Sequence, residues 1–154
     1  MQVIVLGGKN PQQYEWVREV REALEFAGLP VVLHDYAHWL RGEHEIDFEA
    51  ELDAIAELAA VQDDEYIVVA KSIGCMLGAI SIAQGTLKPK ACLLLGLPLK
   101  TAKANAELAS ALGSLPTTIF AQNELDPLGA YEDVKAFARP LVPATTAFVP
   151  LPGD

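Results

Sequence analysis

A serine at the junction of two apolar stretches is the residue best placed to do chemistry in this sequence. Residues 66–70 (YIVVA) are good strand formers, and the stretch after Ser72 (IGCMLGA) is apolar and rich in small residues. A sharp turn from a strand into a helix projects a serine hydroxyl above the sheet, provided that the residues two positions away on each side are small. Ala70 and Gly74 meet that condition. The spacing predicts a nucleophile at Ser72, in a strained turn with a positive φ angle.

The same position has a simpler interpretation. Serine is a favoured N-cap, and the helix predicted over residues 73–84 begins directly after Ser72. In either case the helix N-terminus directs free N–H groups towards the serine, which favours a negatively charged oxygen there.

The rest of the chain alternates short apolar runs with longer helical patterns. The runs lack the alternation of half-exposed strands and are typical of a parallel sheet that is covered on both faces. Strands are predicted at 2–6, 30–34, 66–70, 91–95, 117–121 and 145–149, and helices at 12–27, 47–61, 73–84, 102–112 and 127–138. This order indicates one α/β domain over residues 1–154, with a doubly wound, mostly parallel six-stranded sheet.

In such sheets the ligand site lies at the carboxyl ends of the strands. The segments that follow the predicted strands therefore hold the candidate residues. They are Gly7-Gly8-Lys9-Asn10, His34-Asp35, Lys71-Ser72, Gly96-Leu97-Pro98, Asn123-Glu124-Leu125-Asp126 and Leu151-Pro152-Gly153-Asp154.

Four stretches resemble the α/β-hydrolase family. Residues 70–74 are similar to its nucleophile elbow, with Ala70 in place of the usual first glycine, and residues 3–8 (VIVLGG) to its first central strand and oxyanion loop. Residues 117–129 (TTIFAQNELDPLG) resemble the strand and loop that carry the acid, and residues 148–154 (FVPLPGD) those that carry the histidine. The resemblance covers the whole chain. It implies the strand order 2-1-3-4-5-6. The domain is expected to be small and lidless, because only about 21 residues separate the fourth and fifth strands, too few for a lid domain between them.

By that match Ser72 is the nucleophile and Asp126 the acid, and the oxyanion binds the backbone N–H groups of Ile73 and of Gly8 or Lys9. The resemblance thus implies a serine hydrolase, esterase-like or thioesterase-like, acting on a small ester without a metal or organic cofactor. Glu124 is the second choice for the acid. Asp126 also has a simpler interpretation, as the N-cap of a helix with Pro127 at its first position.

The sequence departs from the family in its histidines. His34, His38 and His44 are the three histidines of the chain, and all of them precede Ser72, whereas the family's base follows the acid. We therefore expect the base shortly beyond Asp154, and the last loop and helix of the fold to be absent from these residues. The alternative is a hydrolase-like binding protein without catalytic activity, because a serine without a base is a poor nucleophile.

Other candidate residues are assigned more simply. His34, His38 and Leu97 are expected to border the substrate, because they lie in or after strand ends. No cluster of histidines and carboxylates has metal-ligand spacing. Gly7–Asn10 would be the phosphate loop of a flavodoxin-like nucleotide binder, but it lacks the known glycine-rich spacings.

Composition limits the partners. The formal net charge of −10 argues against nucleic acid and anionic membranes, because a phosphate backbone requires a basic face. Apolar runs are shorter than the roughly 20 residues that span a bilayer, and no signal peptide is visible, so a cytoplasmic location is expected. Cys75 and Cys92 lie in apolar segments and are expected to be buried free thiols. The resemblance implies a small-molecule ester as the partner; the sequence leaves the oligomeric state open.

Overall fold

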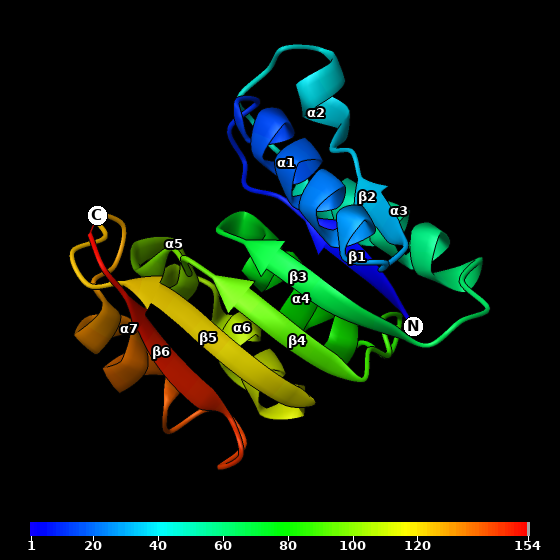
Figure 1. Cartoon of the computed structure of the whole chain (residues 1–154). Helices are drawn as coiled ribbons and strands as arrows, with labels where there is room; N and C mark the ends of the chain where they lie inside the picture. Colours follow the sequence, from blue (N-terminus) through cyan, green and yellow to red (C-terminus); the bar gives the residue numbers. More distant parts are fainter. Residues whose placement is uncertain (154) are drawn as a thin grey trace.

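The computed structural model describes residues 1–153. Its centre is a six-stranded sheet in the order β2-β1-β3-β4-β5-β6, with every neighbouring pair parallel (Figure 1). The strands are β1 (Gln2–Leu6), β2 (Val31–His34), β3 (Tyr66–Lys71), β4 (Ala91–Leu95), β5 (Thr117–Asn123) and β6 (Ala147–Leu151). The predicted fold class and strand order are confirmed.

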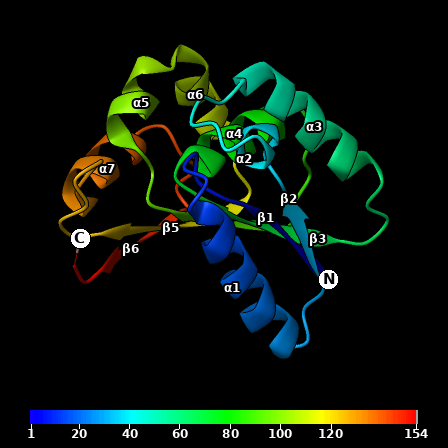
Figure 2. The ribbon, with the colours of Figure 1, turned by 90° about the horizontal axis from the view of Figure 1, so that it is seen from above.

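Helices lie on both sides of this sheet. They are α1 (Gln13–Phe26), α2 (Ala37–Leu40), α3 (Phe48–Ala60), α4 (Ile73–Ala83), α5 (Leu99–Ala104), α6 (Ala106–Ala111) and α7 (Tyr131–Ala138), with a 3-10 turn at Leu112–Ser114. Figure 2 shows α1 on one side of the sheet, and α3 to α7 on the other. The central strand β1 is fully buried from Val3 to Leu6, which explains its continuous apolar run.

Three predicted elements differ from the structure. The helix expected at 102–112 is two short helices, because the backbone of Asn105 is extended and its side chain accepts a hydrogen bond from Leu108 N as a new N-cap. The helix expected at 127–138 begins only at Tyr131, after an N-cap at Ala130. The last strand lies two residues later than predicted, at Ala147–Leu151, and α2 was not predicted. Asp154, the last residue of the segment expected to precede the histidine, lies outside the described residues.

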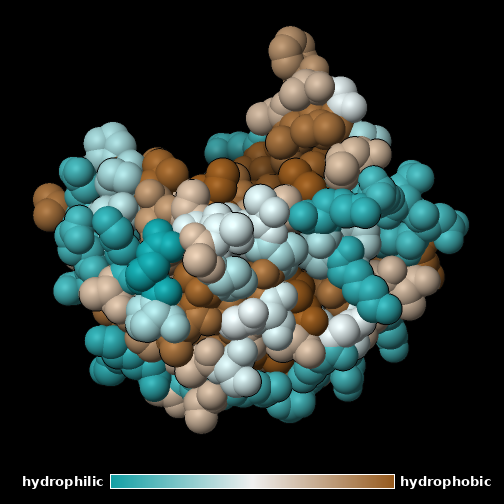
Figure 3. Space-filling model, turned by 90° about the horizontal axis from the view of Figure 1, so that it is seen from below, coloured by the Kyte–Doolittle hydropathy of each residue, from teal (hydrophilic) through white to brown (hydrophobic). Residues whose placement is uncertain are grey.

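One face of the sheet is apolar and partly uncovered. Strand register places Leu93, Ile119 and Ala147 side by side on the face that carries α1. Ile119 is 42% exposed and Val149 is 40% exposed. In Figure 1 β4, β5 and β6 are seen on this face beside α1, and Figure 3 shows apolar side chains in the notch next to the projecting end of α1. Of the helices in residues 1–153, none has both the length and the apolar character to cross a membrane.

Substitutions at two neighbouring residues of β5 test the difference in burial between the two faces of the sheet. Phe120 is 2% exposed and stacks on Phe148 at a centroid distance of 5.2 Å, whereas Ile119 points to the uncovered face. We expect Phe120→Ala to lower the free energy of unfolding by about 3–5 kcal/mol. Ile119→Ala should cost about 1 kcal/mol, because much of its surface stays in water. Urea denaturation measures both, and equal losses would mean that Ile119 is covered in solution.

Candidate active site

Ser72 lies in the sharp turn between β3 and α4. Its φ and ψ angles are 53° and −120°, and no other non-glycine residue in residues 1–153 has a positive φ. The backbone N–H of Ser72 donates to Leu95 O at 2.9 Å, which fixes the turn against β4. The predicted positive φ is confirmed. Such a conformation costs about 1–3 kcal/mol and persists only where the surrounding structure enforces it.

Gly74 shows what enforces this turn. A Cβ atom on Gly74 would lie 2.5 Å from Leu6 O and 2.7 Å from Gly7 O, so the first turn of α4 runs directly against the end of β1. Ala70, two residues before the serine, is completely buried. Small residues at both positions are therefore a steric requirement, as the sequence predicts.

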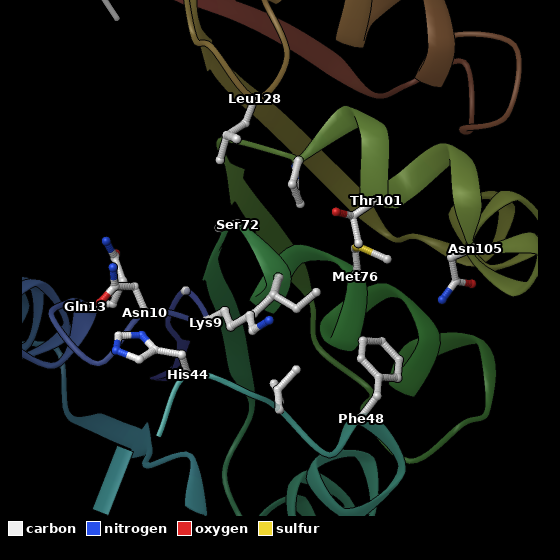
Figure 4. Close-up of a pocket in the computed structure, with 14 residues that line it drawn as sticks. Lys9, Asn10, Gln13, His44, Phe48, Ser72, Met76, Thr101, Asn105 and Leu128 are labelled. Atoms are coloured by element: carbon white, nitrogen blue, oxygen red, sulfur yellow. The ribbon is translucent and has the colours of Figure 1, made fainter. Parts of the chain in front are cut away.

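The hydroxyl of Ser72 does not serve as a helix cap. The side chain makes no capping hydrogen bond to α4, so the N-cap interpretation of the hydroxyl is wrong. Ser72 instead lines a cavity of about 690 Å³. The walls of this cavity come from the loops after β1, β4 and β5, the segment before α3, and the helices α1, α3, α4 and α5 (Figure 4).

The oxyanion-loop candidates lie next to Ser72. Gly8, Lys9 and Ile73 line the same cavity as the serine. A Cβ atom on Gly8 would lie 3.4 Å from the Cβ of Ser72, so the two backbones are in close approach. The N–H of Gly8 makes no hydrogen bond to another described residue. Ile73 is the first residue of α4, where N–H groups lack partners within the helix.

Three side chains hold the carbonyls of this loop. Tyr36 Oη donates to Gly7 O at 2.8 Å, while His38 Nε2 at 2.6 Å and Trp39 Nε1 at 3.2 Å both donate to Lys9 O. Across a trans peptide the carbonyl and the next N–H point in opposite directions. Because Gly7 O points at Tyr36, the N–H of Gly8 points away from Tyr36. Burial, with help from nearby Glu51, raises the pKa of Tyr36 well above its usual value, so this hydroxyl stays a donor.

Asp126 lies at the same edge of the sheet, in a neighbouring hollow of about 220 Å³. The walls of that hollow are Trp16, Lys71, Leu95, Gly96, Ala121, Asn123, Asp126 and Leu151. Ser72 and Asp126 line separate hollows, and Lys71, the residue before Ser72, borders the one that holds Asp126.

The carboxylate of Asp126 is fixed by two hydrogen bonds. Its Oδ1 accepts from Leu128 N at 2.8 Å, and its Oδ2 accepts from Gln122 Nε2 at 3.1 Å. The first bond closes a turn. Asp126 lies five residues before α7 begins at Tyr131, so the N-cap role of Asp126 is wrong. Glu124, the second choice for the acid, is exposed and lines neither hollow.

Lys71 brings a positive charge beside Asp126. Its ammonium lies 4.8 Å from the centre of the Trp16 ring, a cation–π distance. Partial burial lowers the pKa of Lys71, and the negative charge of Asp126 opposes part of that shift. The second hollow thus contains a cation and an anion that partly compensate each other.

The residues expected to border the substrate lie elsewhere. His34 is buried and pairs through Nε2 with Glu51 Oε2 at 2.7 Å, which joins β2 to α3. His38 donates to Lys9 O in the loop after β1, and Leu97 is buried with its N–H donating to Gln122 Oε1 at 2.8 Å. None of the three lines the cavity, so we no longer assign them to substrate binding.

Sequence reasoning missed several residues that do line the cavity. His44 is the clearest case, because it lies in the loop before α3 and shares the cavity with Ser72. The neighbouring Glu45 pairs with Lys9 at 3.3 Å and joins this loop to the oxyanion loop. Nothing local in the sequence signals that contact, since Glu43-His44-Glu45 reads as exposed loop.

Cysteine and metal chemistry have little support among the described residues. Cys75 is buried one turn after Ser72, and burial raises its pKa to about 12, so its thiol stays protonated at neutral pH. Cys92 is likewise buried, with its pKa raised to about 12 by burial. Within residues 1–153 no group of three or more histidine, cysteine, aspartate and glutamate side chains is arranged to hold a metal ion.

Three solved structures that match this fold are a serine hydrolase homologue and two esterases. An α/β serine hydrolase homologue from Coxiella burnetii matches with a TM-score of 0.75 and 19% identity, over 99% of this chain and 75% of that one. Carboxyl esterase 2 from the fungus Tuber melanosporum matches with a TM-score of 0.65 and 17% identity, over 99% and 68%. A zinc-bound, cold-adapted esterase from an Arctic intertidal metagenomic library matches with a TM-score of 0.67 and 17% identity, over 99% and 72%.

These likenesses establish an α/β-hydrolase-like fold. No protein-family model matches the chain, and no curated protein matches its sequence.

The contact of Gly74 with β1 can be tested by two matched substitutions on α4. We expect Gly74→Ala to lower the free energy of unfolding by about 2–3 kcal/mol, because the added methyl meets backbone oxygens that cannot move aside. Gly78→Ala should stay within about 1 kcal/mol of the parent, since its methyl meets the side chains of Leu6 at 3.3 Å and Val68 at 3.8 Å and no backbone atom, and alanine favours the helix. Urea denaturation of both variants gives the comparison. A Gly74→Ala protein as stable as Gly78→Ala would contradict the steric argument.

Proposed function

We propose that this protein is a serine hydrolase of small carboxylic esters, with Ser72 as the nucleophile. The observation that carries the proposal is the positive φ angle of Ser72, in a strand-to-helix turn that borders a cavity. A strained backbone at a cavity is a typical feature of a reactive residue. The hydrolases and esterases that share the fold support the same reaction class.

The backbone around Ser72 suits acyl transfer. When Ser72 Oγ bonds to the ester carbon, the carbonyl oxygen gains negative charge. The N–H of Ile73 at the start of α4, and that of Gly8 or Lys9 on the opposite loop, are the donors we assign to this oxygen. Tyr36 and His38 act as positioning residues, because they fix the carbonyls of that loop.

The proton of Ser72 needs an acceptor. We assign Asp126 as the acid that orients a histidine, and the histidine expected beyond Asp154 stays a prediction. His44 is the one histidine of residues 1–153 that lines the cavity with Ser72, so it is the competing base. His34 and His38 have buried partners and other roles.

Turnover of p-nitrophenyl acetate and labelling by a fluorophosphonate probe test the proposal. Both are measured on residues 1–154 and on the natural gene product, with Ser72→Ala as the control in each. We expect Ser72-dependent turnover in the gene product, and kcat lower by a factor on the order of 10⁶ wherever the base is missing. Ordinary turnover by residues 1–154 would make an upstream group the base, and His44→Ala would then abolish it.

A binding protein without catalytic activity is the second candidate, favoured by the position of all three histidines before Ser72. The binding-protein candidate is favoured if the gene product contains a downstream histidine and the fluorophosphonate probe still does not label it. An activity that survives Ser72→Ala would also exclude Ser72 as the nucleophile.

The acid is tested by a pair of substitutions on one loop. We expect Asp126→Asn to lower kcat of the gene product by about 10³–10⁴, because the amide no longer holds the base in its reactive orientation. Glu124→Gln removes the neighbouring charge and should leave kcat within about twofold, since Glu124 is exposed. Steady-state kinetics with p-nitrophenyl acetate measure both. A larger loss of kcat in Glu124→Gln than in Asp126→Asn would identify Glu124 as the acid.

A further inference from the structure

The cavity beside Ser72 has two chemically different halves. In Figure 4 they lie on opposite sides of the serine: one has Asn10, Gln13 and His44, and the other has Phe48 and Met76, with Thr101 and Asn105 at its end. The first half offers amide and imidazole groups. The second is apolar where it approaches Ser72, because Ile73 and Met76 come from the adjoining turns of α4.

The polar half has no uncompensated charge. Lys9, the cation that lines it, pairs with Glu45 at 3.3 Å, and the other polar groups are carboxamides and an imidazole. A carboxylate or phosphate ligand needs a cation or several converging donors. The chain as a whole has a formal net charge of −10, which opposes anions further. A neutral, hydrogen-bonding group is therefore the better match.

Gln13 indicates that the neutral ligand group must be a hydrogen-bond donor. Its Oε1 is buried and has no hydrogen-bond partner among the described residues. Its Cγ lies 2.9 Å from the position of a Cβ on Gly8, so the side chain packs against the oxyanion loop. A buried acceptor without a donor is unfavourable, and a hydroxyl can supply the missing hydrogen whereas an ionised carboxylate cannot.

The two halves also differ in exposure. Beside α4 the apolar half is closed, because Ile73 and Met76 are 7% and 1% exposed, and it opens only at its far end, at Thr101. In the polar half Asn10 and His44 are exposed. In acyl transfer the acid part of the ester stays bonded to the serine while the alcohol leaves. A closed apolar half suits the acid that stays, and an open polar half suits the alcohol that leaves.

We infer that the substrate is an ester of a short apolar acid with a hydroxyl-bearing alcohol, and that Gln13 accepts a hydrogen bond from that alcohol. The inference rests on the proposed function. Ser72 Oγ bonds to the acyl carbon as the bond from that carbon to the alcohol oxygen breaks, and the serine proton passes through the base to the departing oxygen. Water then releases the acid and restores the Ser72 hydroxyl.

Three esters test this assignment. Glycerol monobutyrate has free hydroxyls on its alcohol, its isopropylidene acetal has the same skeleton with the hydroxyls blocked, and ethyl 3-hydroxybutyrate has the hydroxyl on its acid. We expect kcat/KM of the natural gene product to be about 10-fold higher for glycerol monobutyrate than for either of the others. Gln13→Leu should reduce this preference to about onefold, chiefly through KM for glycerol monobutyrate.

Gln12→Leu is the matched control. Gln12 is the exposed neighbour of Gln13 and does not line the cavity, so the preference should persist in that variant. Thermal melting confirms that both variants are folded. Equal kcat/KM for glycerol monobutyrate and its acetal, a preference for ethyl 3-hydroxybutyrate, or a preference that survives Gln13→Leu would overturn the inference.

A binding measurement separates this inference from the proposed function. Saturation-transfer NMR on the Ser72→Ala protein compares the affinities of glycerol monobutyrate and its acetal without turnover, with and without Gln13→Leu. If the gene product hydrolyses no ester through Ser72, the proposed function fails, and the affinities still decide the inference. A Gln13-dependent preference supports it, and equal affinities reject it.

Discussion

The close approach of α4 to the end of β1 is the constraint on which this site depends. Gly74 lies so near the carbonyls of Leu6 and Gly7 that a methyl group has no room there. The helix must therefore begin abruptly, and the residue before it takes the strain as a positive φ angle at Ser72. The same contact brings the loop after β1 next to the serine, so one steric constraint accounts both for the strained turn and for the position of Gly8 beside Ser72 in the cavity.

Buried aromatic residues keep that loop in place. Tyr36, His38 and Trp39 follow β2 and donate hydrogen bonds to two carbonyls of the loop after β1. The rings of Tyr36 and His38 stack at 5.6 Å, so the donors support one another. A loop whose carbonyls are fixed from behind presents its N–H groups to the cavity without further rearrangement, which is the preorganisation that oxyanion binding requires. His38 therefore supports the loop after β1 and does not line the cavity.

The sequence predicts the fold and the elbow better than the walls of the cavity. Continuous apolar strands and the small residues around Ser72 are local signals with a direct physical meaning, and both are found. The break at Asn105 had a local signal as well, an N-cap residue inside a helical pattern, but the apolar periodicity outweighed it. His44 and Gln13 reach the cavity only through contacts between distant segments, such as the Lys9–Glu45 pair, and no short pattern encodes these.

The separate hollow of Asp126 follows from how its loop folds. Residues 126–129 form a turn in place of the first turn of a helix, and Gln122 and the N–H of Leu128 hold the carboxylate on both oxygens. Lys71 lies beside it, as the last residue of β3 and the neighbour of Ser72. That hollow lies on the side of the sheet that carries α1, because Trp16 of α1 forms one of its walls. β4 to β6 are partly uncovered on the same side, where Ile119 and Val149 are 42% and 40% exposed, so Asp126 lies between α1 and the uncovered part of the sheet.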